Sequence, residues 1–397
     1  MPASFREVVI AGACRTPIGA FQGVLASLSA TQLGALVVKE AVQRAGLDPK
    51  NVDEVIMGCV LPAGVGQAPA RQAAIKAGLP VEVTCMTINK VCGSGLKAVM
   101  LAAQAIMLGD ADVIVAGGME SMSNAPYLLN KARDGYRLGH GELIDSMIKD
   151  GLWDVYNDFH MGNAAELCAR ECNIPRGAQD EFAMMSYRRA QAAQENGMLA
   201  KEIMSVPLAQ KKGEAVVIKE DEEPKKANFE KIAALRPAFD QKGTVTAANA
   251  SKINDGAAAV VVMARTVADQ LGVKAQVKVR AQASAAKKPE WFTTAPIDAI
   301  EKILSTSGFA LDQIDLFEIN EAFAVVTLAA QQRLKIPLEK LNVHGGAVAL
   351  GHPIGASGCR ILVTLIHALQ HYQKKYGMAA ICIGGGEASV MIVENMA

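Results

Sequence analysis

Short apolar runs rich in β-branched residues alternate with amphipathic helical segments along the first third of the chain. The pattern predicts strands over 8–11, 54–59, 86–89 and 112–116, and helices over 30–45, 68–77 and 93–108. Alternation of this kind indicates βαβ units on a largely parallel sheet. We therefore expect an α/β arrangement to begin at the N-terminus.

The pattern changes between about residues 122 and 251. Charged residues cluster in 219–226, helical patterns are interrupted and clear strands are few. An alanine- and valine-rich strand over 257–263 then resumes the sheet, and a second α/β part follows from about residue 275. These shifts predict three parts, namely an N-terminal half (1–121 with 252–273), an inserted loop domain (122–251) and a C-terminal half (274–397).

Two stretches of the chain repeat each other. Residues 91–95 form a small-residue turn that leads through an apolar helical stretch and a buried strand to Gly117-Gly118. Residues 355–358 begin the same order, which ends at the glycine run 384–386. A repeat of this length marks a duplicated supersecondary unit. We therefore expect two similar α/β halves packed face to face.

Composition and charge narrow the class of protein. The 397 residues carry 40 basic and 40 acidic side chains, which gives no argument for nucleic acid or an anionic membrane as a partner. No uninterrupted apolar run is long enough to span a bilayer, and residues 1–6 lead directly into a strand, so we expect a cytoplasmic location. Eight cysteines without a regular framework fit a reducing compartment, and they lack metal-type spacing.

Two residues have the surroundings of a nucleophile and its base. Cys92 precedes Gly-Ser-Gly at the start of a predicted helix, where the helix dipole and free N–H groups are expected to depress its pKa. A small buried cysteine at a strand–helix turn is the alternative interpretation. His352 lies between Gly351 and Pro353 in a glycine-rich loop, and histidine is the natural base for a thiol near neutral pH.

Other polar residues follow buried strands in the second half. Cys382 lies at the end of one strand, beside Gly384, and is either a site residue or an ordinary core cysteine. Asn320 follows the strand 316–319, and its amide requires partners there, so it is a structural anchor or a holder of water or a carbonyl oxygen. His344 is a weaker candidate than His352.

Taken together, Val-Cys92-Gly-Ser-Gly, Asn320-Glu-Ala-Phe, Gly-His352-Pro and Cys382-Ile-Gly384, in this order, resemble the thiolase family. Within it, the chain is similar to the acetyl-CoA acetyltransferases over nearly its whole length. The resemblance implies a thiolase fold, with two duplicated βαβαβαββ halves in a five-layered αβαβα core and an inserted domain that binds CoA. It also implies a reversible Claisen condensation of two acetyl-CoA molecules to acetoacetyl-CoA and CoA.

The resemblance also implies roles for the residues just named. Cys92 would carry the acetyl group, His352 would take its proton, and Cys382 would be the acid/base that removes a proton from the second acetyl-CoA. Asn320 would hold a water that forms one oxyanion hole with His352, and the N–H groups of Cys92 and Gly384 would form the other.

Binding contacts are carried over in the same way. CoA and its acyl group are expected at Leu152, His160, Met161, Tyr187, Lys226, Asn228, Lys231, Phe239, Ser251 and Phe292. Lys226 stands where relatives carry an arginine, so a planar stacking surface is missing from that contact. No covalently bound cofactor is expected, and the family's assembly implies a homotetramer.

Several stretches resemble the potassium-activated, mitochondrial-type branch of the family. They are 88–91, 219–223, 246–251 and 292–296. In that branch the ion is held mostly by carbonyl oxygens, the ligands that a hard cation prefers. The resemblance therefore predicts weak potassium binding by Tyr187, Ala247, Ala248, Ala250 and Val348.

Two other functions stay open at this point. A degradative 3-ketoacyl-CoA thiolase shares every catalytic motif and differs in the depth of its acyl pocket. A thiolase-fold protein that binds acyl-CoA without catalysis is the other, although the intact Cys92, His352 and Cys382 argue against it.

Overall fold

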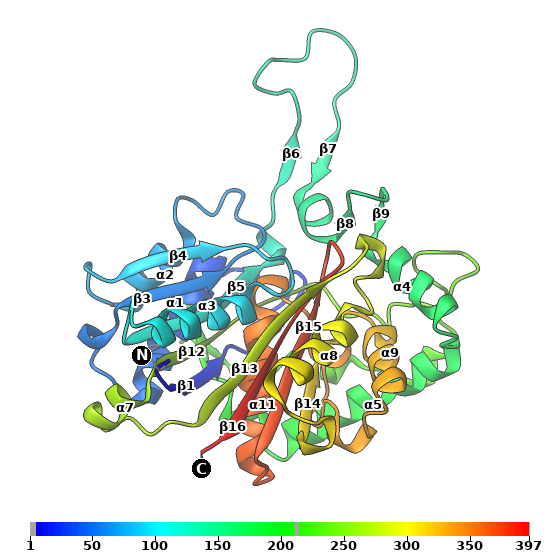
Figure 1. Cartoon of the computed structure of the whole chain (residues 1–397). Coiled ribbons are helices and arrows are strands. Elements are labelled where there is room, and N and C mark those ends of the chain that lie inside the picture. Colours follow the sequence, from blue (N-terminus) through cyan, green and yellow to red (C-terminus); the bar gives the residue numbers. More distant parts are fainter. Residues whose placement is uncertain (1–4, 211–213, 397) are drawn as a thin grey trace.

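The computed structural model describes residues 5–210 and 214–396. A ten-stranded sheet runs in the order β14-β15-β16-β13-β1-β12-β5-β3-β4, with β2 paired to β12 beside this path (Figure 1). Its strands are β1 Val8–Arg15, β2 Gly19–Ala20, β3 Glu54–Gly58, β4 Thr84–Ile88, β5 Val113–Ser121, β12 Asn254–Ala264, β13 Val277–Ala286, β14 Leu316–Ile319, β15 Tyr376–Ile383 and β16 Glu387–Asn395. The two halves of the chain meet where β1 pairs with β13.

Neighbouring strands run in both directions, so the prediction of a largely parallel sheet was wrong. The pairs β3–β4, β3–β5 and β14–β15 are parallel, whereas β5–β12, β1–β12, β15–β16 and β13–β16 are antiparallel. In each half the chain turns back beside the strand it has just left. A parallel pair requires the connecting chain to cross back to the end of the sheet at which the first strand began. The connections from β5 to β12 and from β15 to β16 do not cross back in this way.

Helices cover the outer faces of the two half-sheets and also separate the half-sheets. α1 (Ala30–Ala45) and α2 (Pro69–Ala77) cover the first half, and α8 (Ala295–Ser307) and α9 (Ala324–Leu334) cover the second. Between the halves lie α3 and α11, whose apolar side chains share one core with strands of both (Figure 1). The bounds of these central helices are Ser94–Leu108 and Ile354–His371. This five-layered arrangement confirms the predicted α/β halves packed face to face.

Strand alternation explains the layering. In β5, Ile114 and Ala116 belong to the central core, whereas Val113 and Val115 pack against α1 and α2. Because both faces of the strand are buried, it is read in the sequence as one continuous apolar run.

The predicted elements agree closely with the observed ones in the first half. α1 spans 30–45 as predicted, and Ser29 and Gln32 form a capping box at its start. The larger differences are at β1, which continues to Arg15, at β5, which continues to Ser121, and at α11, which begins at Ile354 rather than at Cys359.

Equivalent glycines of the two repeats let α3 and α11 cross at very close range. A Cβ atom on Gly95 would lie 2.7 Å from the backbone nitrogen of Cys359, and one on Gly358 would lie 2.5 Å from that of Leu96. Backbone atoms of a packed helix cannot yield to such an approach. The N-termini of the two helices are therefore held together, one directly after Cys92 and the other after His352.

The segment Val91–Leu108, which contains α3, is long and apolar enough to cross a membrane, with a mean hydropathy of 1.6. In the structure 56% of this segment is buried inside the protein, between the two half-sheets. Its apolar character is accounted for by the central core, to which its buried apolar residues belong.

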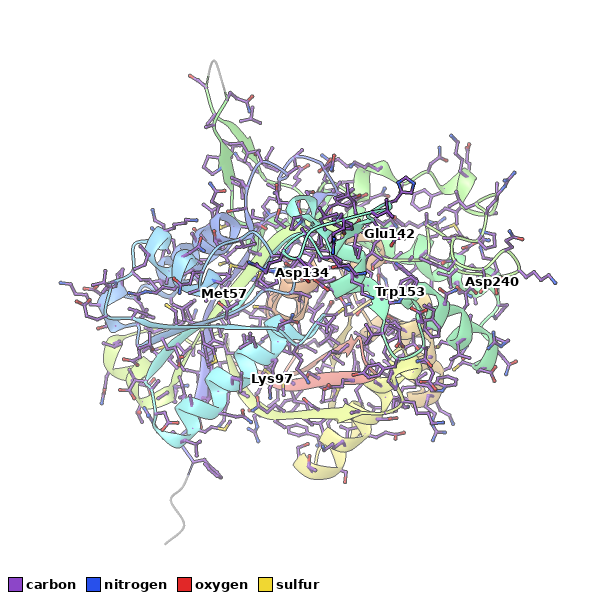
Figure 2. The ribbon with its side chains drawn as sticks, turned by 90° about the horizontal axis from the view of Figure 1, so that it is seen from above. Met57, Lys97, Asp134, Glu142, Trp153 and Asp240 are labelled. Atoms are coloured by element: carbon purple, nitrogen blue, oxygen red, sulfur yellow. The ribbon has the colours of Figure 1, made fainter. Side chains whose placement is uncertain are left out.

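Residues 122–253 leave the sheet after β5 and return at β12. They form α4 (Met161–Glu171), α5 (Arg176–Glu195), α6 (Phe229–Ile232) and short strand pairs. The pairs are β6 Tyr127–Leu129 with β7 Leu143–Asp145, β8 Trp153–Asp154 with β9 Phe159–His160, and β10 Val206–Leu208 with β11 Val216–Ile218. The β6–β7 pair is an arm that projects from the body (Figure 1). Asp134 and Glu142 mark this arm in the view from above (Figure 2).

A buried ion pair ties the inserted segment to the first half. Both carboxylate oxygens of Asp221 accept hydrogen bonds from the guanidinium of Arg15, at 2.7 and 2.8 Å, and Glu202 accepts another at 2.5 Å. The acidic run 219–223 therefore contributes a core contact as well as surface charge, and the bidentate geometry fixes its position on β1.

Replacing Gly358 by alanine should test the helix crossing. The new Cβ would overlap the α3 backbone, and overpacking of this kind costs about 1–3 kcal/mol of unfolding free energy or more. The matched control is Gly177→Ala on α5, where a Cβ meets nothing within 4 Å, and alanine there should stabilise by about 0.5–1 kcal/mol. Urea-induced unfolding followed by circular dichroism measures both, and equal midpoints for the two variants would contradict the close crossing.

Candidate active site

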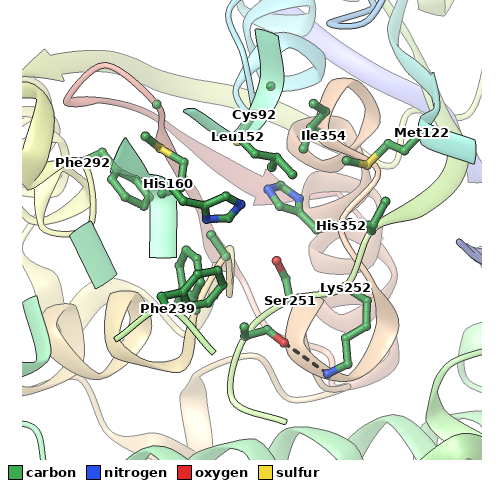
Figure 3. Close-up of a pocket in the computed structure, with 17 residues that line it drawn as sticks. Cys92, Met122, Leu152, His160, Phe239, Ser251, Lys252, Phe292, His352 and Ile354 are labelled. Atoms are coloured by element: carbon green, nitrogen blue, oxygen red, sulfur yellow. Dashed lines mark hydrogen bonds between the residues drawn. The ribbon is translucent and has the colours of Figure 1, made fainter. Parts of the chain in front are cut away.

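A cavity of about 230 Å³ lies at the N-termini of α3 and α11, beneath the inserted segment. Figure 3 shows His352 and His160 facing each other across it. Predicted site residues from distant parts of the sequence meet on its wall, namely Cys92, Leu152, His160, Met161, Phe239, Ser251, Phe292, His352 and Gly384. The structure therefore brings the candidate nucleophile and base into one chamber with most of the predicted pocket residues.

Cys92 lies on the turn between β4 and α3, after a strained residue. Val91 has a φ of +43°, a left-handed conformation that a β-branched side chain rarely adopts. The backbone N–H of Val91 donates to Asn89 Oδ1 at 2.9 Å, and Ser94 Oγ donates to the Val91 carbonyl at 2.7 Å. These bonds hold the turn in the conformation that places Cys92 on the cavity wall.

Burial raises the pKa of the Cys92 thiol to about 11, so the expectation of a depressed pKa was wrong. The N–H groups of Gly384 and of Cys92 itself lower the pKa, but by less than desolvation raises it. The resting side chain is therefore a thiol that needs a base to become a nucleophile. These are also the two N–H groups predicted to bind a thioester oxygen.

His352 is held as a neutral ring with one nitrogen free for proton transfer. Ser357 Oγ donates to the Pro353 carbonyl at 2.9 Å and lies 2.6 Å from His352 Nδ1. Because the single hydroxyl proton is used, Nδ1 must carry the proton that bridges to Oγ, and Nε2 carries a lone pair. Burial, with a smaller effect of Arg360, lowers the pKa of His352 to about 3. Nε2 has no hydrogen-bond partner among the described residues.

Cys382 and Asn320 lie behind the cavity wall. Burial raises the pKa of Cys382 well above its usual range, the nearby Cys92 raises it further, and the N–H of Ala322 opposes them. Asn320 is fully buried, and neither polar atom of its amide has a hydrogen-bond partner among the described residues. An amide in this state suits the predicted role of holding a water molecule.

Aromatic rings form one side of the chamber. His160 stacks on Phe239 with ring centroids 4.8 Å apart, and Phe323 meets both Phe239 and Phe292 edge to face at 6.0 and 6.4 Å. His160 Nδ1 accepts the Gly162 N–H at 3.0 Å, so the ring caps α4 and its other nitrogen faces the cavity. This wall is largely apolar, which suits a small acyl group.

Two family models together span almost the whole chain. Residues 8–266 match "Thiolase, N-terminal domain" and residues 273–395 match "Thiolase, C-terminal domain". The chain belongs to the thiolase family.

Relatives of this thiolase align over its whole length. It is 54% identical over 390 residues to the acetyl-CoA acetyltransferase of Cupriavidus necator, which covers 98% of this chain and 99% of that one. It is 50% identical to the mitochondrial acetyl-CoA acetyltransferase of Bos taurus, over 99% of this chain and 92% of the other. The crystal structure of the Bacillus anthracis acetyl-CoA acetyltransferase matches with a TM-score of 0.97 at 40% identity, covering 99% of this chain and all of that one. The predicted thiolase fold is confirmed.

Other predicted CoA contacts of the thiolase lie outside the chamber. Lys226, Asn228 and Lys231 are exposed around α6, and Lys226 is paired with Glu222 at 2.8 Å. Tyr187 packs edge to face on Phe229, with ring centroids 6.4 Å apart. These contacts stay predictions. His344 lies away from the cavity, near Tyr372, as its weaker candidacy suggested.

Two of the residues predicted to hold potassium, Ala250 and Val348, bind a lysine side chain of this thiolase. The ammonium of Lys252 donates to the carbonyls of Ala250 and Val348, at 3.1 and 3.0 Å, and lies 5.1 Å from the centre of the Tyr187 ring. A cation of this chain therefore takes two of the carbonyl oxygens expected to bind the metal. Ala247 and Ala248 adjoin this loop, and neither accepts a hydrogen bond from the ammonium in the described part of the chain.

Two residues at the site were missed from the sequence. Glu120 is buried at the end of β5, and its carboxylate accepts N–H bonds from Val60, Leu61 and Gly355, which joins the first half to the start of α11. The sequence did offer a signal for Glu120, which is a charged residue near the end of an otherwise apolar strand. Ser357, which orients His352, was read only as part of the repeat.

The raised pKa of Cys92 predicts a steep pH dependence of alkylation. A group whose pKa is near 11 stays protonated at neutral pH, so the thiolate fraction should grow about tenfold per unit between pH 7 and 9. Mass spectrometry of the Cys92 peptide after brief iodoacetamide treatment measures the rate. A rate that is already constant by pH 7 would contradict the raised pKa.

Proposed function

We infer that this thiolase is an acetyl-CoA acetyltransferase, which condenses two acetyl-CoA molecules reversibly to acetoacetyl-CoA and CoA. Relatives with this name, at about half identity and nearly full coverage, support the activity. The observation that carries it is the chamber in which Cys92 shares a wall with Gly384 and with His352, whose Nε2 has no hydrogen-bond partner among the described residues.

The first half-reaction transfers an acetyl group to the protein. His352 Nε2 takes the proton of Cys92, whose sulfur attacks the thioester carbon, and the N–H groups of Cys92 and Gly384 receive the developing oxyanion. When the intermediate collapses, the carbon–sulfur bond to CoA breaks. Cys382 gives its proton to the leaving thiolate, so CoA departs as a thiol and Cys92 keeps the acetyl group. The raised pKa of Cys382 supports this order, because it enters the step protonated.

The second half-reaction forms the carbon–carbon bond. The Cys382 thiolate removes a proton from the methyl group of a second acetyl-CoA, while a water held by Asn320, together with His352, stabilises the enolate oxygen. The enolate carbon attacks the acetyl group on Cys92, and the bond from that carbon to the Cys92 sulfur breaks. Cys92 regains its proton from His352, so both cysteines and the histidine return to their starting states.

The acyl-CoA would enter along the wall formed by the inserted segment. Ser251, Leu152 and Met161 line the chamber there and are placed to meet the pantetheine arm. The nucleotide would lie outward, toward Lys226, Asn228 and Lys231 on the exposed surface around α6. Phe292 closes the aromatic side of the chamber, which favours a short acyl group over a long one.

We also propose a homotetramer in the cytoplasm. The projecting arm supports the assembly, because Tyr127, Leu138 and Leu143 on it are 65%, 99% and 70% exposed. Apolar side chains gathered on a projecting hairpin are typical of a protein–protein contact. The cytoplasmic location rests on the sequence and stays a prediction.

Thiolysis of acetoacetyl-CoA, followed by the loss of its enolate absorbance, tests the activity. Cys92→Ala should lose about a thousandfold or more in kcat/KM, because the covalent route is removed. Cys85→Ala is the matched control, since that cysteine lies on β4 and does not line the cavity, and it should keep full activity.

The same assay separates the alternatives. Incubation with acetyl-CoA alone should add one acetyl group to Cys92, detectable by mass spectrometry, and the alanine variant should not gain it. Equal or better use of 3-ketooctanoyl-CoA would replace the proposal with a thiolase of broader chain length. Absence of turnover with either substrate would favour a protein that binds acyl-CoA without catalysis.

A further inference from the structure

We propose that Lys252 is a built-in cation that takes the place of a potassium ion and makes this thiolase independent of added monovalent cations. Lys252 lines the chamber, and the observation is the position of its ammonium group, which donates to two backbone carbonyl oxygens and lies over one aromatic face. The thiolysis measurements in the test below rest on the proposed function, whereas the melting measurements do not.

The ammonium joins three segments that are far apart in the sequence. It donates to Ala250 on its own loop and to Val348 on α10 (Ala347–Leu350), and it lies over the ring of Tyr187 on α5. Figure 3 shows the side chain turned away from the middle of the chamber toward the Ala250 carbonyl. Carbonyl oxygens and an aromatic face are the partners that a buried monovalent cation prefers.

Two nearby acidic side chains, Glu223 and Glu321, favour a cation at this point. Glu321 is buried, and it accepts hydrogen bonds from Ser186 at 2.7 Å, Asn342 at 2.9 Å and the Val348 N–H at 3.1 Å. Burial lowers the pKa of Lys252 to about 8, while Glu223 and Glu321 favour its charged form. At neutral pH the ammonium therefore persists despite the loss of solvent.

The contact connects two walls of the active site. Ser251 precedes Lys252 and lines the chamber, and the Lys252 carbonyl accepts the His352 N–H at 3.3 Å. Val348, on α10, lies four residues before His352. Because the cation binds both segments, it should stabilise the wall proposed for pantetheine and the position of the base together. A tethered ammonium cannot dissociate, so the segments stay joined at any potassium concentration.

The opposing interpretation is that Lys252 binds a phosphate of CoA. A lysine in that role would extend into the chamber or toward its mouth and would leave the carbonyls of Ala250 and Val348 to other donors. The observed hydrogen bonds to both carbonyls argue against it.

The test compares salts at equal ionic strength. Melting temperature and acetoacetyl-CoA thiolysis are measured in potassium, sodium and choline chloride for the wild type, for Lys252→Ala, which opens space, and for Lys252→Met, which fills it without charge. The exposed Lys39→Ala is the matched control.

The wild type and the control should each show the same melting temperature in all three salts. Their kcat/KM values should agree within about twofold across the salts. Lys252→Ala should melt lower by roughly 5 °C in choline chloride and recover in potassium chloride, because the ion can enter the opened site. Its kcat/KM should recover about tenfold in parallel. Lys252→Met should be impaired in every salt.

Several results would overturn the proposal. Activation or stabilisation of the wild type by potassium would show that the ion still binds, and this outcome needs no variant to fold. A Lys252→Ala protein that matches the wild type in choline chloride would show that no cation is needed. A variant whose KM for CoA alone rises, with an unchanged melting temperature, would assign Lys252 to CoA binding. If no salt or variant shows turnover but the melting pattern holds, the proposed activity fails and the built-in cation stands.

Discussion

The close crossing of α3 and α11 is the contact on which the site depends. Gly95 and Gly358 remove the side chains that would separate the helices, and the two N-termini come together as a result. Cys92 precedes one helix and His352 precedes the other, so a nucleophile and a base from opposite halves meet without either half enclosing them alone. Glu120 strengthens the junction, since it accepts N–H bonds from both halves.

The two repeats carry a serine at equivalent positions, Ser94 and Ser357, and the two serines have different roles. In the first repeat, Ser94 donates to the Val91 carbonyl and stabilises the strained turn before Cys92. In the second repeat, Ser357 donates to the Pro353 carbonyl and thereby orients His352. Each hydroxyl donates to a nearby backbone carbonyl, three residues back in the first copy and four residues back in the second. One copy holds a nucleophile on the wall, and the other selects the tautomer of a base.

Burial controls the chemistry of the groups that the crossing assembles. It raises the pKa of Cys92 and lowers the pKa of His352, so both are neutral at rest, and no stable ion pair exists to be disrupted when substrate enters. A neutral site surrounded by aromatic side chains admits an uncharged thioester at little desolvation cost. Charge then develops only during the reaction, where N–H groups are already placed to receive it. The charge of Lys252 is likewise compensated within the protein, because its ammonium donates hydrogen bonds to two backbone carbonyls.

The sequence by itself determined the elements, the repeat and the candidate residues Cys92, His352, Cys382 and Asn320, because periodicity, turn residues and motif order are local properties. The direction of the sheet strands, the raised pKa of Cys92 and the role of Ser357 depended on the tertiary structure. So did the occupation of the predicted potassium ligands by Lys252. Helix-end effects can be read from neighbours in the sequence, whereas desolvation depends on which distant segments cover a group. At Cys92 the distant effect is the larger, and only the folded chain could decide its sign.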